Sequence, residues 1–264
     1  MCEIGASAPL QCEPMNIPLL IAHRGYACRY PENTLEAIQA ALEVGACYVE
    51  WDIQLARDGV PVLLHDATLL RTAGRPEAVF ELSSARLATI AVGQREIFGE
   101  RFAGVRTPTL AAAVELMTRW PRAQAFAEVK PESVERFGVA RVVESVAADL
   151  ERSGDQIVPI SSVVEFLVLA RRADLPRVGL VLKEWSEEAH RTLERLQPDF
   201  VFCNLKRLPD EAELWLGSWR WVVYEVVDPD LALRLAARGV DLIETMAIGE
   251  MLADPRLVPR GCRD

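Results

Sequence analysis

The sequence predicts an α/β protein with a (β/α)8 barrel of the TIM type, and two observations support this fold class. Eight short apolar runs alternate with longer stretches of helical periodicity, which is typical of right-handed strand-helix-strand units and a parallel sheet. The 264 residues also match the ~250 that such a barrel usually takes. A doubly wound open sheet is the alternative that the same alternation allows. No low-complexity linker or internal repeat divides the chain, so we expect one domain over residues 1–264.

The predicted strands are short apolar runs bounded by polar or turn-forming residues. They lie at residues 17–23, 47–55, 123–129, 156–161, 177–182, 199–203, 220–226 and 240–244. Helical stretches are expected at residues 33–45, 109–120, 132–154 and 229–239. Residues suited to helix N-caps and glycines suited to helix ends mark these stretches: Asn33, Thr109 and Asp228, then Gly45, Gly154 and Gly239.

One irregularity interrupts the alternation after the strand at 47–55. Arg57, Asp58 and Gly59 form a turn signal, and the apolar run 60–65 follows directly. We therefore expect a hairpin strand where a helix would otherwise lie. Residues 67–108 are mixed in character and contain glycine, and we interpret them as a small insertion that caps one end of the barrel.

Charge and hydropathy exclude several classes of partner. The chain has 39 acidic and 29 basic residues, a net charge of −10, which repels nucleic-acid backbones and anionic lipid surfaces. We therefore expect no nucleic-acid partner. We also expect no stable membrane insertion, because no uncharged apolar stretch reaches the ~18 residues that a spanning helix needs. The sequence leaves the oligomeric state open.

The six cysteines and residues 1–16 indicate in which cellular compartment the protein is located. The cysteines, at positions 2, 12, 28, 47, 203 and 262, form no CxxC pair and no zinc-site spacing, so reduced and mostly buried thiols are expected in a chain of this length. Residues 1–16 carry an acid where a signal peptide has bases, and they lack its apolar run. Both features predict a cytoplasmic protein.

Three acidic residues are expected at the same end of the barrel. Alternation along the strand at 47–55 places Glu50 and Asp52 together on the lumen face, near the carboxyl end where barrel enzymes have their active sites. Glu128 and Lys130 share the lumen face of the strand at 123–129. Three carboxylates supply the hard oxygen ligands that suit Mg²⁺ or Ca²⁺. Alternatively, the acids form salt bridges with Arg24 and Lys130, or are protonated by burial.

Two of the three histidines reach the same end. His23 ends the first strand and His65 ends the hairpin strand, so they are candidates for proton donor and acceptor on either side of a scissile bond. His190 lies on an amphipathic helix and is assigned no function. Arg24 and Lys130 are suited to hold a phosphoryl group. The set indicates a metal-assisted hydrolase or lyase that acts on an anionic substrate.

The motifs also carry a resemblance to a known family. They are AHRGY at 22–26, PENT at 31–34, VEWDIQLARDGVPVLLHD at 49–66 and AEVKP at 127–131, and in this order they resemble the glycerophosphodiester phosphodiesterase family. Similarity continues through 69–74, 102–116 and 237–245. The resemblance implies a TIM-type barrel with a small insertion. It also implies hydrolysis of glycerophosphodiesters, such as glycerophosphocholine and glycerophosphoethanolamine, to sn-glycerol 3-phosphate and an alcohol.

The resemblance further implies a role for each matching side chain. The histidines would be the general acid and base, three acids would hold a divalent cation (Mg²⁺ or Ca²⁺), and two cationic residues would hold the phosphate. In that order they are His23 and His65, then Glu50, Asp52 and Glu128, then Arg24 and Lys130. The neighbouring glycerol hydroxyl would be an internal nucleophile that gives a cyclic phosphate, which water then opens.

Departures from the family pattern lie near the C-terminus. Tyr224, Glu225 and Val227 stand where the family usually has a Trp-Thr-Val-Asn string, and we expect Tyr224 to replace its aromatic wall against the substrate. Glu244 is an additional acid, and Met246 stands where the family often has Asp. These changes leave the head-group alcohol open, with a cationic head group as one hypothesis. Two alternative functions are a lysophospholipase D and a noncatalytic barrel that binds phosphate esters.

Overall fold

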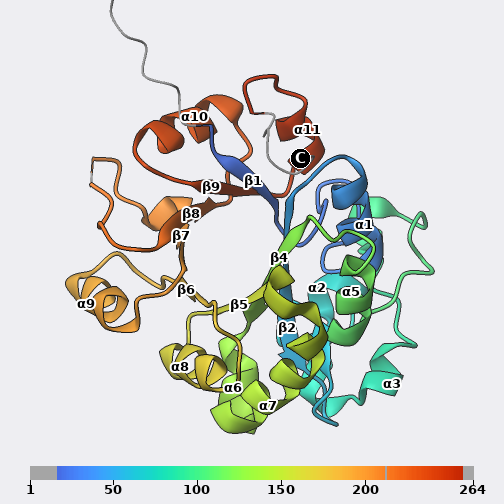
Figure 1. Cartoon of the computed structure of the whole chain (residues 1–264). Coiled ribbons are helices and arrows are strands. Elements are labelled where there is room, and N and C mark those ends of the chain that lie inside the picture. Colours follow the sequence, from blue (N-terminus) through green and yellow to red (C-terminus); the bar gives the residue numbers. More distant parts are fainter. Residues whose placement is uncertain (1–16, 212, 258–264) are drawn as a thin grey trace, which may run out of the picture.

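A closed barrel of parallel strands forms the centre of the molecule (Figure 1). The computed structural model describes residues 17–211 and 213–257. Within these residues, eight parallel strands follow one another around the barrel, and β1 pairs with both β2 and β9. This closure confirms the TIM-type barrel and excludes the open sheet.

The strands and helices lie close to the predicted stretches. The barrel strands are β1 (Leu19–Ala22), β2 (Tyr48–Leu55), β4 (Gln124–Val129), β5 (Ile157–Ser161), β6 (Gly179–Val181), β7 (Phe200–Asn204), β8 (Arg220–Tyr224) and β9 (Leu242–Thr245). The helices around them are α1 (Leu35–Glu43), α5 (Leu110–Met117), α6 (Pro131–Phe137), α7 (Val139–Leu150), α8 (Val164–Arg172), α9 (Glu187–Leu196), α10 (Pro229–Ala237) and α11 (Ile248–Leu252). Two short 3-10 helices, η2 (Glu151–Gln156) and η3 (Leu205–Arg207), lie between them.

The strand faces divide as alternation predicts. Val49, Trp51 and Ile53 of β2 are fully buried in the large apolar cluster between the strands and the helices. The lumen has a separate apolar cluster, in which the Phe126 ring lies edge-on to the Phe200 ring at 4.9 Å between centroids. Burial of these side chains stabilises the barrel by roughly 25 cal/mol per Å² of apolar surface removed from water. The polar lumen residues lie beyond this cluster, at the carboxyl ends of the strands.

Helix boundaries include two corrections. The N-cap of α1 is Thr34, whose side chain accepts a hydrogen bond from the Ala37 amide, and not Asn33. Asn33 has a left-handed backbone (φ 55°) and its side chain binds Asp52. The predicted helix at 132–154 is two helices, because Gly138 (φ 81°) interrupts the helical backbone between α6 and α7. The expected caps Thr109 and Asp228 are confirmed.

The insertion after β2 has its own small apolar core. β3 (Pro61–Leu63) pairs antiparallel with β2, which confirms the predicted hairpin. The segment then forms α2 (Leu70–Ala73), η1 (Val79–Glu81), α3 (Ser84–Leu87) and α4 (Arg95–Phe98) around buried side chains such as Leu69 and Leu87. In Figure 1, α2 and α3 lie on the same side of the barrel as α5. The insertion reaches the carboxyl end of the barrel through Arg71 and Gln94, which both bind Glu32.

The loop after β1 depends on a glycine. Gly25 has a φ of 78°, and a Cβ at this position would lie 2.5 Å from the carbonyl carbon of Ala37 in α1. Only glycine allows both the left-handed backbone and this close approach to α1. The turn directs the neighbouring residues His23 and Arg24 toward the barrel mouth.

Gly25→Ala is therefore expected to lower the free energy of unfolding by about 2–4 kcal/mol, from left-handed strain and overpacking together. Chemical denaturation measures this effect. Gly104→Ala is the matched control, because a Cβ there meets no atom within 4 Å and no positive φ is involved. An effect of Gly25→Ala no larger than that of the control would contradict the tight contact with α1.

The cysteines differ from the expectation. Cys28 and Cys203 are free thiols, but Cys47 is disulfide-bonded, so the prediction of reduced thiols is wrong at that position. Cys2, Cys12, Cys262 and the segment 1–16 lie outside the described residues.

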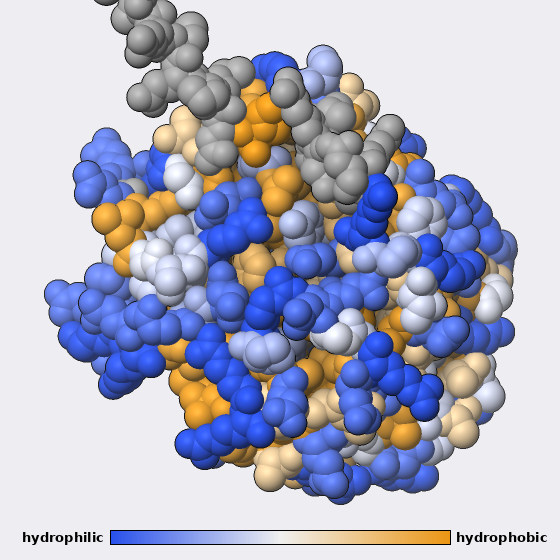
Figure 2. Space-filling model, in the orientation of Figure 1, coloured by the Kyte–Doolittle hydropathy of each residue, from blue (hydrophilic) through white to orange (hydrophobic). Residues whose placement is uncertain are grey.

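Among the described helices, none is long and apolar enough to cross a membrane. Hydrophilic residues cover much of the face seen in Figure 2, around the barrel axis.

Candidate active site

The barrel mouth holds a cavity of about 180 Å³ at the carboxyl ends of the strands. Its lining includes seven of the eight residues proposed from sequence: His23, Arg24, Glu50, His65, Glu128, Lys130 and Tyr224. The eighth, Asp52, is fully buried and pairs in register with Glu128 across β2 and β4. The structure therefore brings all eight residues together, at the end of the barrel where this fold places active sites.

The three predicted metal ligands form one cluster. Carboxylate oxygens of Glu50, Asp52 and Glu128 lie within 4.8 Å of one another. Burial, and then the negative charge of Asp52, raises the pKa of Glu50 well above its usual range. Burial also raises the pKa of Glu128. For Asp52, burial alone would raise the pKa, but the charges of Lys130 and Arg24 outweigh it and hold the pKa below the usual range.

Two cationic side chains pair with these acids. The Arg24 side chain places Nε 3.2 Å from Asp52 Oδ2, and its backbone amide donates to Glu50 Oε2 at 3.1 Å. Lys130 Nζ lies 3.2 Å from Asp52 Oδ1 and 3.1 Å from Glu128 Oε1. The salt bridges that the sequence left as an alternative are thus present. Both cationic side chains still line the cavity, where a phosphate group could reach them.

The acid cluster fits a divalent cation. Its donors are carboxylate oxygens, which Mg²⁺ and Ca²⁺ prefer. Glu50 Oε1 is buried and has no hydrogen-bond partner. Burying such a charged group without a partner is costly, so a cation beside it would offset the cost. These residues are therefore a suitable set of ligands for the cation that the sequence motifs imply.

The two histidines have different surroundings. His23 is 5% exposed, and its Nε2 lies 3.9 Å from Glu50 Oε2. Burial, with the charge of Arg24 next, lowers the pKa of His23 to about 3, so the ring is neutral at neutral pH. His65 is more accessible, and its Nδ1 lies 2.6 Å from Asp66 Oδ1. Asp66 thereby fixes the His65 ring and leaves Nε2 available for proton exchange.

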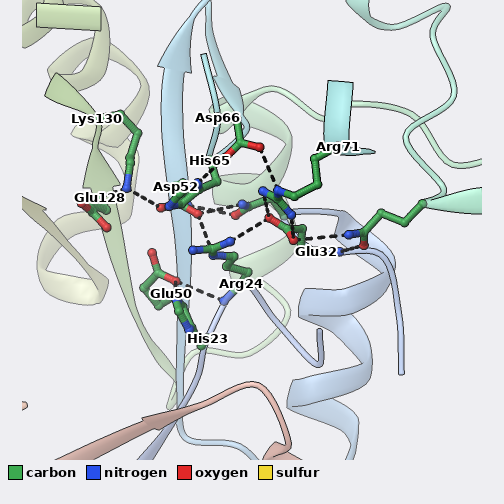
Figure 3. A network of polar contacts seen from close by, with 12 residues as sticks. His23, Arg24, Glu32, Glu50, Asp52, His65, Asp66, Arg71, Glu128 and Lys130 are labelled. Atoms are coloured by element: carbon green, nitrogen blue, oxygen red, sulfur yellow. Dashed lines mark hydrogen bonds and ion pairs between the residues drawn. The ribbon is translucent and has the colours of Figure 1, made fainter. Parts of the chain in front are cut away.

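Sequence reasoning missed a network behind these residues (Figure 3). Arg71 from the insertion binds Asp66 with Nε at 2.8 Å, and its Nη1 and Nη2 bind both oxygens of Glu32. Glu32 in turn accepts a hydrogen bond from Arg24 Nη1 at 3.0 Å. Asn33 binds Asp52 through both its amide nitrogen and its amide oxygen. The sequence does contain a signal for this network, namely Glu32 and Asn33 in the PENT motif and Asp66 directly after His65. Their spacing along the chain, however, does not show which side chains they contact.

The departures near the C-terminus occupy different places. Tyr224 lies edge-on to His23, with ring centroids 6.2 Å apart, and burial raises its pKa to about 12. Glu225 is at the mouth and 3.5 Å from Lys206 Nζ. Glu244 is 3% exposed and also lines the cavity. His190 stacks on Trp215 at 4.8 Å between ring centroids and does not line the cavity.

Family comparison agrees with this geometry. A profile of the glycerophosphoryl diester phosphodiesterase family matches residues 23–245, which includes all eight site residues. The chain belongs to this family. Within the family, the chain is 41% identical over 99 residues to a glycerophosphodiester phosphodiesterase of Caldanaerobacter subterraneus, covering 38% of this chain and 40% of that relative. It is 40% identical over 94 residues to glycerophosphodiester phosphodiesterase 1 of Rattus norvegicus, covering 36% of this chain and 28% of that relative. The matched segment therefore spans less than half of either relative.

Solved structures with the same fold cover nearly the whole chain. A phosphodiesterase of Oleispira antarctica, in complex with the product sn-glycerol 3-phosphate, is 23% identical with a TM-score of 0.77, covering 90% of this chain and 96% of that one. A glycerophosphodiester phosphodiesterase of Agrobacterium tumefaciens is 25% identical with a TM-score of 0.70, covering 90% of this chain and 100% of that one. The fold of this chain therefore agrees with its membership of the glycerophosphoryl diester phosphodiesterase family over about 90% of its length.

Proposed function

We propose that this protein hydrolyses glycerophosphodiesters to sn-glycerol 3-phosphate and an alcohol, with a divalent cation as cofactor. The observation that carries the proposal is that two histidines and two cationic side chains line one small cavity, together with a cluster of three carboxylates of which two line it and Asp52 lies buried beside them. Anionic phosphate suits Arg24 and Lys130, and the acids suit a cation. The product found with the Oleispira antarctica phosphodiesterase supports the glycerol phosphate half of the substrate.

The proposed reaction begins inside the substrate. The glycerol hydroxyl next to the phosphodiester attacks phosphorus, so a new O–P bond forms while the bond to the alcohol breaks. One of His23 and His65 accepts the hydroxyl proton and the other protonates the departing alcohol. Water then opens the cyclic phosphate with these roles exchanged. A divalent cation bound to Glu50, Asp52 and Glu128 would stabilise negative charge on the phosphoryl oxygens.

The protein positions each of these groups in advance. Asp66 orients His65, and Arg24 and Lys130 are held by ion pairs to Asp52. Tyr224 packs against His23 and forms a wall for the substrate. Such fixed positioning lowers the entropic cost of bringing the internal nucleophile and the acid-base groups together.

An assay with purified full-length protein tests this function. Glycerophosphocholine and glycerophosphoethanolamine should release sn-glycerol 3-phosphate with Mg²⁺ or Ca²⁺, and an excess of chelator should reduce the rate at least about 100-fold, since metal charge stabilisation supplies several kcal/mol. Enzymatic detection of sn-glycerol 3-phosphate measures the rate. Full turnover in chelator would refute the metal requirement. If the protein binds these substrates but does not hydrolyse them with either Mg²⁺ or Ca²⁺, the result would instead support a noncatalytic barrel.

The lysophospholipase D alternative finds less support. It requires a groove for an acyl chain, whereas the described lining of the cavity is mostly charged or polar, with Ile160, Val181 and Phe202 among its apolar members. Lysophosphatidylcholine in the same assay should therefore be a much poorer substrate than glycerophosphocholine.

We further propose that the chain works as one domain. A cytoplasmic location stays a prediction.

A further inference from the structure

Glu244 is a buried acid that the proposed reaction does not use. It lies on β9, in register with Ile21 of β1 and with Tyr224 of β8, and it lines the cavity. Its side chain is 3% exposed, and its Oε1 has no hydrogen-bond partner. Among the described residues, Arg24 and Lys130 form ion pairs with Glu32, Asp52 and Glu128 instead. A carboxylate in this position therefore lacks a partner that would offset its burial.

Two other donors converge on the same point. One ligand atom each from His23, Glu50 and Glu244 lies within 4.8 Å of the other two. His23 Nδ1 and Glu50 Oε1 are likewise buried and without a hydrogen-bond partner. Nitrogen and oxygen donors at this spacing require only small movements to bind one metal ion at ~2.0–2.2 Å.

We propose that His23, Glu50 and Glu244 form a second divalent-cation position, which shares Glu50 with the set of Glu50, Asp52 and Glu128. The first set offers oxygen atoms alone and suits Mg²⁺ or Ca²⁺. The second includes an imidazole nitrogen and therefore favours a transition metal such as Mn²⁺ or Zn²⁺. A carboxylate shared by two cations fits the way two-metal hydrolase sites are built.

Charge balance predicts the order of binding. Glu50, Asp52, Glu128 and Glu244 carry four negative charges when ionised, against the two positive charges of Arg24 and Lys130. One divalent cation thus neutralises the site, and the second should bind more weakly unless an anion such as phosphate is also present. Occupation of the second position also removes a His23 nitrogen from proton transfer, so it should slow turnover. This consequence for rate, unlike the binding itself, rests on the proposed function.

The test measures cation binding at equilibrium. Full-length protein is stripped of metal and titrated with Mn²⁺ alone, with and without inorganic phosphate, while the free Mn²⁺ is followed by electron paramagnetic resonance. Wild type should bind two Mn²⁺ per chain, with the second bound more tightly when phosphate is present. Glu244→Gln should retain one and weaken the other at least about 10-fold, since loss of a direct ligand exceeds the effects of outer-shell changes.

Controls separate this site from general loss of structure or charge. Glu225→Gln removes an acid at the mouth that pairs with Lys206, and it should keep both Mn²⁺. Glu244→Leu supplies an apolar side chain of the kind that fills the rest of the lumen, so it serves if Glu244→Gln does not fold. Binding of only one Mn²⁺ by wild type would overturn the proposal. So would a folded Glu244 variant that binds two Mn²⁺ as tightly as wild type does. Because binding needs no turnover, failure of the phosphodiesterase assay would leave this test intact.

Discussion

Replacing His65 with alanine is expected to lower kcat on glycerophosphocholine about 10²–10⁴-fold, the usual effect of removing a general acid or base. The ring lines the cavity and Asp66 Oδ1 lies 2.6 Å from its Nδ1, so the variant loses the oriented ring that we propose as a proton carrier and leaves the proposed cation ligands in place. KM should change far less than kcat. Steady-state kinetics at saturating cation measure both constants.

Two variants sharpen the test of His65. His190→Ala removes a histidine that stacks on Trp215, and it should leave kcat within about 2-fold of wild type, as expected for a residue outside the site. Asp66→Asn keeps the ring but weakens its orientation, so kcat should fall by a smaller factor than in His65→Ala. If His65→Ala retains more than a tenth of the wild-type kcat, His65 is not a proton carrier in this reaction.

Asp52→Asn is expected to lower the free energy of unfolding by about 3–5 kcal/mol, as the loss of one partner from a buried ion pair usually does. Asp52 is fully buried, and Arg24 Nε and Lys130 Nζ each lie 3.2 Å from one of its oxygens. An amide cannot balance these two charges. Asn33 Nδ2, which donates to Asp52 Oδ2 at 2.8 Å, also risks losing its acceptor. Denaturation in urea with a chelator present measures the effect without the contribution of bound cation.

An exposed ion pair provides the control for Asp52. Glu188 lies 3.0 Å from Arg191 on the surface of α9, and water screens exposed pairs of this kind, so they contribute little to stability. Glu188→Gln should therefore change the free energy of unfolding far less than Asp52→Asn does. Equal effects of the two substitutions would mean that the Asp52 pairs are not a major source of stability.

The sequence predicts most of what a single strand determines. Alternation along β2 suffices to put Glu50 and Asp52 on the lumen face, because side-chain direction in a strand has a period of two residues. It could not reveal that Glu32 binds Arg71, since that contact depends on how the insertion packs 39 residues further along the chain. It also could not show that Glu244 lies beside Glu50, because the two residues become neighbours only when β9 and β2 flank β1 in the closed barrel.

Local backbone chemistry explains the remaining differences. Asn33 is a good N-cap residue by type, but its side chain is used to hold Asp52, and Thr34 caps α1 instead. Gly138 lies within a stretch of continuous helical periodicity, yet its positive φ divides the stretch into α6 and α7. In both cases the sequence pattern alone did not determine the structure: a tertiary contact decided the outcome at Asn33 and a single backbone angle decided it at Gly138.

The aromatic packing beneath the cavity affects how substrate and water enter the site and how the alcohol leaves it. Phe126, Phe200 and Phe202 fill the lumen below the polar residues, with centroid distances of 4.9 and 5.1 Å from Phe126 to the other two. Among the described residues this packing closes the lumen below the cavity, so we expect substrate, departing alcohol and incoming water to pass through the mouth at the carboxyl ends of the strands. In the proposed reaction the alcohol leaves before water enters, so we expect a bulky or slowly departing alcohol to delay hydrolysis of the cyclic phosphate.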